Sequence, residues 1–402
     1  MKTLRLVAIL IGLLLLFLSI PVAAQDQELY SWSSKHYRVF TDSNVTESME
    51  IARKLEAALL LFNEFLHYDL DQLKLPLRVR IFTEKEAYDS YLNRLISETR
   101  SDFVYISYSD PSRSELVGFQ REEKDFNASL LHYGFIQFLS AFVPNAPLWL
   151  EEGMATYLEY SQYDPMTEAF SWTTNYAWLD SLKKILSSAE VIDKYTLRGL
   201  LLINKERAQE NIELFYPTTW GLVHFLLQSP EKSHNRILWE SLDTLDGTAT
   251  LRENSRRVLE RAFRWVDLAE LQRSFESYSN SLMTFNDLVR QGVEQYGTED
   301  LSAARSSFEQ ALRLRSDNYI PYYYLGLIAY QEKDFAVARD FYGRASDLGI
   351  DAGLINYALG VNAFADQRYD QATEFLLKAK ELDPESYGAK TDSLLQRIDF
   401  MQ

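Results

Sequence analysis

Two neighbouring stretches, LLHYGFIQ (130–137) and PLWLEEGMATYLEY (147–160), decide the fold of the first two thirds of the chain. Apolar residues follow His132 at distances of three and four positions in the first stretch, and of seven positions just beyond it, so they share one face of a helix with it. In the second stretch, Pro147 is suited to open a helix that carries Glu152. The sequence therefore predicts two consecutive helices, one with a histidine and one with a glutamate.

The His132 helix has part of a zinc-binding pattern. An HExxH site needs two histidines four residues apart on one helix, a glutamate beside the first to activate water, and a third ligand from another helix. Here His132 holds the first ligand position, Tyr133 replaces the general base, Ile136 replaces the second histidine, and Glu152 stands where a third ligand would be. A tyrosine phenol, with a pKa near 10, is a poor base at neutral pH. The sequence therefore predicts no catalytic residue and no cofactor.

Residues of roughly 32–284 resemble the peptidase-MA-like domains of the gluzincin type, which are often fused to tetratricopeptide repeats. The resemblance rests on several stretches in family order: SKHYRVFTDS, LPLRVRIF, the His132 helix, PLWLEEGMATYLEY and FYPTTWGLVHFLL. It implies an α+β zincin-like domain with a helical subdomain and a degenerate HExxH motif. Members with an intact motif are taken to bind zinc through both motif histidines and the downstream glutamate. Only His132 and Glu152 match these ligands, so the resemblance makes them vestigial ligand positions.

Two interpretations of this region stay open. In the first, His132 is hydrogen-bonded to a nearby carboxylate such as Glu152, and the domain is a pseudopeptidase. In the second, the chain is an active, divergent zinc metallopeptidase that uses His132, Glu152 and a further ligand such as His224. The first interpretation is preferred, because the chain lacks both the second histidine and the water-activating glutamate of the motif.

The residues before this region alternate between strand and helix patterns. Strands are expected within 37–41, 75–83, 103–109 and 115–122, and helices from Asn44 to Leu66 and from Glu84 to about Ser97. In the stretch 75–83, the apolar residues and the two arginines fall on opposite faces. The expected division is a zincin-like α/β part over 25–174 and a helical subdomain over 175–284. Three tryptophans are expected in the core: Trp149, Trp220 and Trp265.

The last third, 285–402, is a repeat array. Glycines recur every 34 residues, and so do two alanines and a large apolar residue, at Gly292, Gly326 and Gly360, at Ala304, Ala338 and Ala372, at Ala311, Ala345 and Ala379, and at Phe308, Tyr342 and Leu376. This period and this order of small and large residues are the tetratricopeptide pattern, in which each helix pair buries its apolar face against a neighbour. The pattern predicts repeats at 285–318, 319–352 and 353–386, followed by a capping helix to about Phe400.

The concave face of such an array is expected to present nine aromatic and apolar side chains. They form the predicted peptide-binding groove: Val289, Val293, Tyr296, Tyr323, Leu327, Tyr330, Tyr357, Val361 and Phe364. The sequence leaves two interpretations of this groove. It either binds a protein or peptide partner, or packs on the peptidase-like domain and makes the array a rigid spacer.

The first 24 residues have the pattern of a signal peptide, with Lys2 and Arg5 before the apolar run 6–20 and small residues before Gln25. An uncleaved anchor is the alternative, and only then is a membrane expected as a partner. The absence of cysteine excludes disulfides and thiolate sites, and it favours a bacterial cell envelope or periplasm over a eukaryotic secretory route. A formal net charge of −17 argues against nucleic acid as a partner.

Together these patterns predict an exported, catalytically inactive metallopeptidase-like protein that acts as a protein- or peptide-binding scaffold. The alternatives are the active zinc peptidase described above and a purely structural scaffold in which only the repeats bind.

Overall fold

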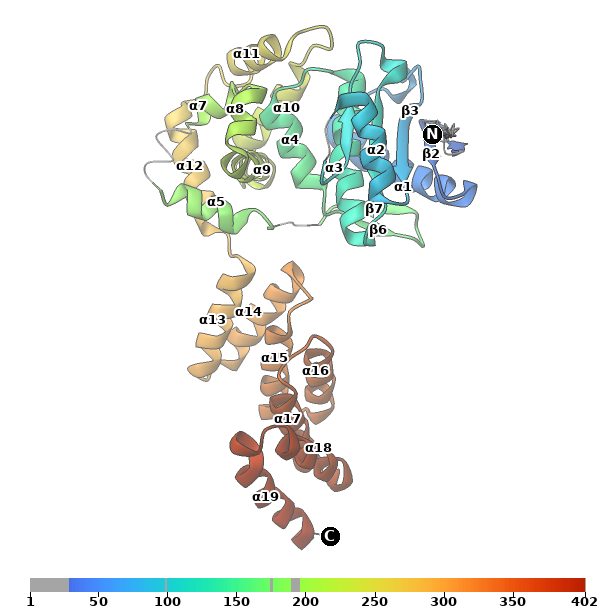
Figure 1. Ribbon diagram of the computed structural model, residues 1–402. Helices are drawn as coiled ribbons and strands as arrows, with labels where there is room; N and C mark the ends of the chain where they lie inside the picture. The colour runs from blue at the N-terminus through green and yellow to red at the C-terminus, as the bar shows by residue number, and fades with distance from the viewer. Residues whose placement is uncertain (1–28, 98–99, 174–175, 189–195, 402) are drawn as a thin grey trace, which may run out of the picture. The chain divides into compact units, whose positions relative to one another are not determined.

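The computed structural model describes residues 29–97, 100–173, 176–188 and 196–401 (Figure 1). The predicted signal peptide, 1–24, lies outside these residues. The described chain divides into two compact units, and α1 (Val45–Leu66) contributes to both. The first unit contains the chain up to Glu56 together with Leu73–Glu122, and the second contains Ala57–Gln72 and everything from Glu123 onward.

The first unit is built on a five-stranded sheet in the order β1-β2-β3-β5-β4. The three central strands are parallel to one another, whereas both edge strands run antiparallel to their neighbours. The strands are β1 (Tyr30–Ser33), β2 (Tyr37–Thr41), β3 (Leu77–Phe82), β4 (Val104–Ile106) and β5 (Glu115–Phe119). The four predicted strands are confirmed, β2 with the predicted bounds and the other three with shorter ones, and β1 was not predicted.

Helices in this unit begin and end close to the predicted positions. The Asn44 side chain accepts a hydrogen bond from the Glu47 amide at 2.9 Å and so caps the start of α1. Helix α2 (Lys85–Ile96) packs Tyr88 and Leu92 against β3 and β5. Two short 3-10 helices lie in this part of the chain. η2 (Pro111–Arg113) belongs to the first unit, and η1 (Leu70–Gln72) belongs to the segment Ala57–Gln72 of the second.

Strand β3 shows how alternation sets the two faces of the sheet. Val79 and Ile81 are completely buried on one face, as the pattern predicts. On the other face, Arg80 is also buried, with 8% of its surface exposed, because it makes two hydrogen bonds to the Glu115 carboxylate at 3.0 and 3.2 Å. The predicted polar face is therefore an internal ion pair at this position.

The second unit is helical apart from one hairpin. After the end of α1, it continues with α3 (Glu123–Phe142) and α4 (Leu148–Leu158), followed by the unpredicted hairpin of β6 (Gln162–Asp164) and β7 (Ala169–Ser171). The described residues from 176 to 284 form helices and connecting turns, as expected: α5 (Leu179–Leu186), α7 (Leu197–Leu201), α8 (Lys205–Glu210), α9 (Ile212–Gln228), α10 (Lys232–Asp243), α11 (Leu251–Arg261) and α12 (Leu268–Ser281).

Two of the three tryptophans expected in the core are there. Trp149 and Trp220 are fully buried, but the prediction for Trp265 is wrong, because 82% of its surface is exposed. Trp265 lies in the turn between α11 and α12, where the Arg264 guanidinium stacks over its ring at 4.8 Å from the ring centre. An aromatic in a short turn has no second element to cover it, so hydrophobicity alone does not place it inside.

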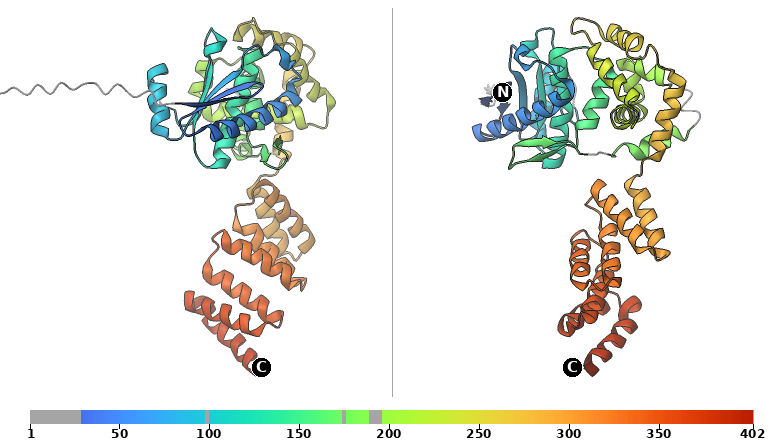
Figure 2. Two further views of the ribbon diagram at one scale, coloured as in Figure 1. Left: turned by 90° about the vertical axis from the view of Figure 1, so that its right-hand side faces the viewer. Right: turned by 180° about the vertical axis from the view of Figure 1, so that it is seen from behind.

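The last seven helices form an array of three antiparallel pairs followed by a single terminal helix (Figure 2). They are α13 (Phe285–Gly297), α14 (Leu301–Leu314), α15 (Tyr319–Gln331), α16 (Phe335–Asp347), α17 (Ala352–Ala365), α18 (Tyr369–Leu382) and α19 (Pro384–Met401). Each repeat glycine faces the large residue of its own pair: a Cβ added at Gly292, Gly326 or Gly360 would come within 2.8 Å of Phe308, Tyr342 or Leu376. The all-helical repeat organisation is therefore confirmed. Among the described helices, none combines the length and apolar character that crossing a membrane requires.

Candidate functional site

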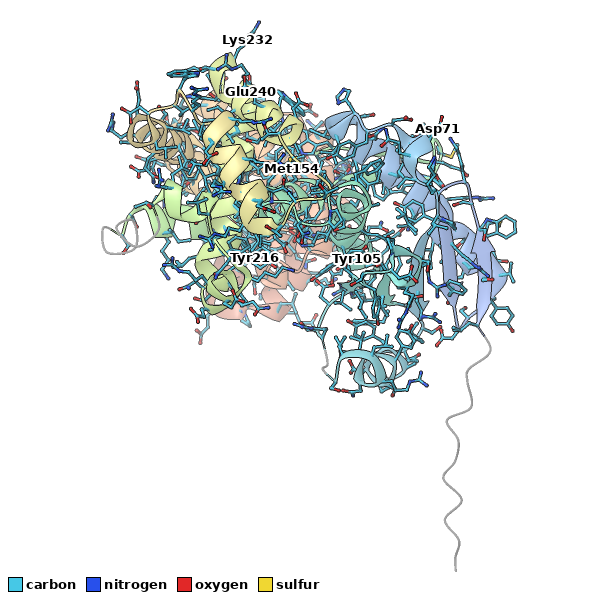
Figure 3. The ribbon with its side chains drawn as sticks, turned by 90° about the horizontal axis from the view of Figure 1, so that it is seen from above. Asp71, Tyr105, Met154, Tyr216, Lys232 and Glu240 are labelled. Carbon is cyan, nitrogen blue, oxygen red and sulfur yellow. The ribbon has the colours of Figure 1, made fainter. Side chains whose placement is uncertain are left out.

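The site around His132 and Glu152 is held by the packing of α4 between α3 and α9. Gly153, next to Glu152, makes this packing possible, because a Cβ there would lie 2.6 Å from the Val223 side chain and 2.8 Å from the Thr219 carbonyl oxygen of α9. Figure 3 labels Met154 of α4 and Tyr216 of α9 within this layer. The glycine in the motif EEGMA thus fixes the depth at which the glutamate before it is presented.

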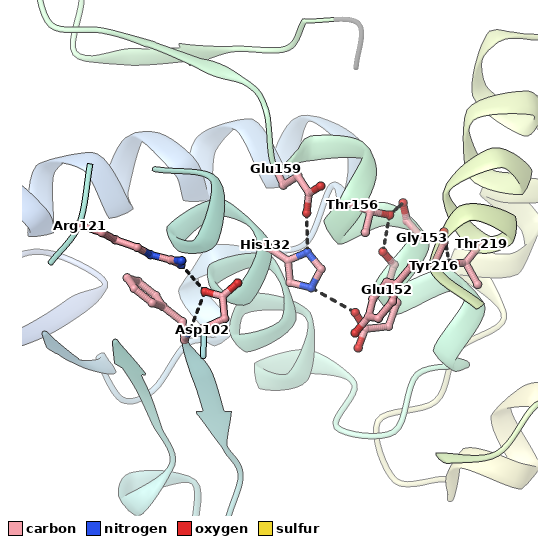
Figure 4. Close-up of polar contacts among 10 residues, drawn as sticks. Asp102, Arg121, His132, Glu152, Gly153, Thr156, Glu159, Tyr216 and Thr219 are labelled. Atoms are coloured by element: carbon pink, nitrogen blue, oxygen red, sulfur yellow. Dashed lines mark hydrogen bonds and ion pairs between the residues drawn. The ribbon is translucent and has the colours of Figure 1, made fainter. Parts of the chain in front are cut away.

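His132 and Glu152 come together as the sequence predicts. His132 Nε2 lies 3.2 Å from Glu152 Oε2, and His132 Nδ1 lies 2.9 Å from Glu159 Oε2 (Figure 4). The histidine is buried, with 7% of its surface exposed. The preferred interpretation of His132 as a histidine held by a carboxylate is confirmed for Glu152. The second carboxylate, Glu159, was missed.

A sequence signal for Glu159 did exist. It follows Glu152 by seven residues, which is almost two full helical turns, so both carboxylates project from the same side of α4 and its last turn. Thr156 lies between them and turns its hydroxyl back to the Glu152 carbonyl oxygen, to which it donates a hydrogen bond at 2.7 Å. The face of α4 toward His132 is therefore acidic at both ends.

The charges around His132 keep it protonated. Burial acts to lower its pKa, but the hydrogen bonds to Glu152 and Glu159 and the charges of these two carboxylates outweigh burial and raise the pKa to about 10. At neutral pH both ring nitrogens consequently carry a proton and both donate. An imidazolium has no lone pair to offer to a metal ion, so zinc could bind here only by displacing a proton and breaking one of these contacts.

Glu151 adds a second perturbed group to the site. Burial, followed by the negative charge of Glu152, raises its pKa to about 8, against opposing effects of Lys205 and His132. A carboxyl group in this state is largely protonated at neutral pH. The site thus combines one imidazolium, two carboxylates and one mostly neutral carboxyl group.

Aromatic rings surround the histidine. The Tyr133 ring centre lies 4.8 Å from that of His132, and the Tyr216 ring of α9 lies 6.4 Å away and stacks on Trp178 at 5.9 Å. Tyr133, in the position of the general base, and Ile136, in that of the second histidine, are both half-buried on α3. Neither side chain supplies a carboxylate or an imidazole in those places.

His224 lies in a different cluster. Its Nδ1 is 3.0 Å from the Tyr278 hydroxyl, and its ring packs against Tyr157, Tyr176 and Trp220 at centre distances of 5.1–5.9 Å. Burial lowers its pKa to about 4, so it is neutral at physiological pH. The structure does not bring His224 to His132. Across the described part of the chain, no three histidine, aspartate or glutamate side chains are arranged to hold a metal ion.

All nine predicted groove residues lie on the first helix of a pair: α13, α15 or α17. Eight of them are half-buried and Val293 is 36% exposed, so none of the nine is fully buried. Neighbouring pairs are linked on this side, because the Gln331 side chain donates a hydrogen bond to the Tyr296 hydroxyl at 2.8 Å. At the far end, Tyr387 of α19 stacks on Tyr357 at 5.0 Å. The nine residues are thus partly accessible, and five of them are aromatic.

Comparison of the chain with protein-family models and with curated protein sequences found no match. The resemblance to zinc peptidases and the tetratricopeptide pattern are therefore carried by the residues named above.

Proposed function

We propose that this chain is an exported, catalytically inactive zinc-peptidase-like protein that binds a protein or peptide partner in the bacterial cell envelope. The observation that carries the first half of this proposal is the state of His132. Both of its nitrogens are engaged by carboxylates, and its raised pKa keeps it protonated at neutral pH. The positions where a peptidase keeps its base and its second histidine hold Tyr133 and Ile136.

The second half of the proposal rests on the repeat array. Its first helices present tyrosines, a phenylalanine and aliphatic side chains that are neither fully buried nor fully exposed, and a partly accessible aromatic surface is suited to an extended peptide or an amphipathic helix. The proposal includes a zincin-like fold for the first part of the chain and tetratricopeptide repeats for the last part. The candidate surfaces for a partner are then the repeat groove and the former substrate cleft.

Metal content tests the inactive state. The purified chain 25–402 is dialysed against trace zinc and analysed for metal, with His132→Ala and Glu152→Ala variants prepared in parallel. We expect no bound zinc in any of the three proteins, and no chelator-sensitive proteolysis of unstructured substrates such as casein. Near-stoichiometric zinc that disappears in either variant would overturn the proposal and establish the active peptidase instead.

Cross-linking in intact cells tests the partner. A photo-reactive amino acid replaces Leu327 in the groove or, as a matched control, Arg313 on α14 outside the predicted groove. We expect a specific adduct from position 327 that is lost when Tyr323 and Tyr330 are changed to alanine. Adducts from position 313 alone, or adducts that persist in the double variant, would remove the groove from the proposal.

A further inference from the structure

The edge strand β1 has an open side. It pairs with β2 alone among the described strands, and all four of its residues are exposed. The Ser34 amide donates to the Tyr37 carbonyl oxygen at 2.9 Å, which makes this pair a hydrogen-bonded one. Because hydrogen-bonded and non-hydrogen-bonded pairs alternate in an antiparallel ladder, the backbone groups of Ser31 and Ser33 point away from β2.

One face of this edge is strongly basic. Ser33 and Ser31 stand opposite Arg38 and Phe40 of β2, which in turn stand opposite Arg78 and Arg80 of β3. Residues in register across strands project from the same face, so the three arginines gather beside the two serines. Each of the three guanidinium carbons lies 5.1 Å from the centre of the Phe40 ring.

The members of this arginine cluster differ in their partners. Arg78 and Arg80 both contact the Glu115 carboxylate, at 3.4 and 3.0 Å, while Arg38 is exposed and enters no ion pair among the described residues. Arg80 is buried, so the accessible positive charge of this face comes from Arg38 and the partly exposed Arg78, in a chain whose formal net charge is −17. This positive charge attracts an anionic partner and repels a basic one.

The other face of the same edge is apolar. Tyr30 and Trp32 stand opposite the buried residues Thr41 and Val39, yet they remain 42% and 41% exposed, because no element within the described part of the chain covers the end of the sheet there. A strand added to β1 would place its side chains alternately beside the arginines and beside these two aromatic rings.

We propose that β1 binds an extended polypeptide segment in which acidic residues alternate with apolar ones. The segment completes its backbone hydrogen bonds with Ser31 and Ser33. Its carboxylates lie over these small side chains, within reach of Arg38, and its apolar residues pack on Tyr30 and Trp32. This binding edge is separate from the repeat groove and from the His132 site, so it goes beyond the function proposed above.

Three labelled peptides test the proposal by fluorescence anisotropy with the chain 25–402. One alternates glutamate and valine over eight residues, the second has the same composition in two blocks, and the third alternates lysine and valine. We expect the alternating acidic peptide to bind at least tenfold more tightly than either control, and its binding to weaken as sodium chloride is raised to about 0.5 M. Equal binding of all three peptides, or binding of none, would overturn the proposal.

Variants assign the binding to the edge. Arg38→Gln is expected to weaken binding by about fivefold to tenfold, through loss of a charge-assisted contact, whereas Arg236→Gln, an exposed arginine on α10, should leave it unchanged. Ser31→Pro removes an outward N–H that β2 does not use, so we expect binding to be lost while circular dichroism and melting stay the same. Trp32→Ser, which leaves the backbone untouched, is expected to weaken binding as well.

Two other occupants would show themselves in the same experiments. Concentration-dependent self-association that Ser31→Pro abolishes would show that a second copy of this chain binds to β1, and it would overturn the proposal. Tighter binding to vesicles with about 30% anionic lipid than to the alternating peptide would overturn it too, because a flat anionic surface has no use for the backbone of β1.

Discussion

Glu152 and Glu159 hold His132 between them, each accepting a hydrogen bond from a different nitrogen of its ring. The two carboxylates come from one face of α4, whereas the histidine comes from α3, so the three charges join the two helices. An imidazolium between two carboxylates satisfies its own donors and neutralises half of the negative charge that α4 buries. His132, Glu152 and Glu159 thus form an internal ion cluster.

Removing the imidazolium should destabilise this part of the protein. In His132→Gln, the two carboxylates keep at most weak donors, so their mutual repulsion and burial are no longer offset. We expect a loss of about 3 kcal/mol in the free energy of unfolding at pH 7, measured by urea-dependent hydrogen exchange of α3 and α4. His67→Asn, at an exposed position with a φ of 53° that asparagine tolerates, is the control and should change little. A similar loss in both variants would contradict the ion-cluster interpretation.

The contribution of His132 should also depend on pH in a defined direction. Its pKa is raised from the ordinary 6.5 to about 10 in the folded chain. The stabilisation is therefore complete below pH 6.5, where histidine is protonated in both states, and is lost as pH rises from 6.5 through about 10. We expect the stability difference between the native chain and His132→Gln to shrink over that window. NMR of the ring protons checks the same point, because His132 should remain an imidazolium at pH 8.

The contact between His132 and Glu152 could be predicted from sequence, because two flanking helices and an incomplete ligand motif already placed the residues together. Glu159 had a weaker signal, its spacing of seven residues from Glu152, which does not decide the contact because a side chain at the helix end could equally have faced water. Alternation in β3 placed Arg80 on the face opposite the apolar residues, but alternation cannot reveal a buried partner such as Glu115. A pair such as Arg80 and Glu115 forms only because β3 and β5 are neighbours in the sheet, and a local sequence pattern does not predict the order of strands.

Glu115 should be among the most sensitive residues of the sheet. Its side chain is 5% exposed, and its oxygens accept hydrogen bonds from Arg78, Arg80 and the Tyr91 hydroxyl. In Glu115→Ala, the Arg80 charge stays buried without its carboxylate, so we expect the first unit to lose about 3–5 kcal/mol. Thermal melting, together with hydrogen exchange of the amides of β3 and β5, measures this loss of stability.

A matched control for Glu115 lies on α11. Glu260→Ala removes a carboxylate that is 67% exposed and only 3.9 Å from its arginine partner, so it should cost no more than about 0.5 kcal/mol. If Glu115→Ala proved equally mild, the arginine cluster would have to be hydrated in the folded chain, and the buried-pair description would be wrong.

The repeat glycines should separate into those that packing requires and those that it does not. At Gly326, an added Cβ would lie 2.5 Å from the Tyr342 ring, which is itself almost fully buried, so neither α15 nor α16 can give way. Gly326→Ala is therefore expected to cost about 1–3 kcal/mol, seen as faster hydrogen exchange in α15 and α16. Gly343, inside α16, has no atom within 4 Å of the corresponding position, and Gly343→Ala should instead stabilise that helix by up to about 1 kcal/mol. If Gly→Ala changes the free energy of unfolding in opposite directions at these two positions, the 34-residue glycine period reflects packing between helices. If both changes have the same sign, the period reflects helix propensity instead.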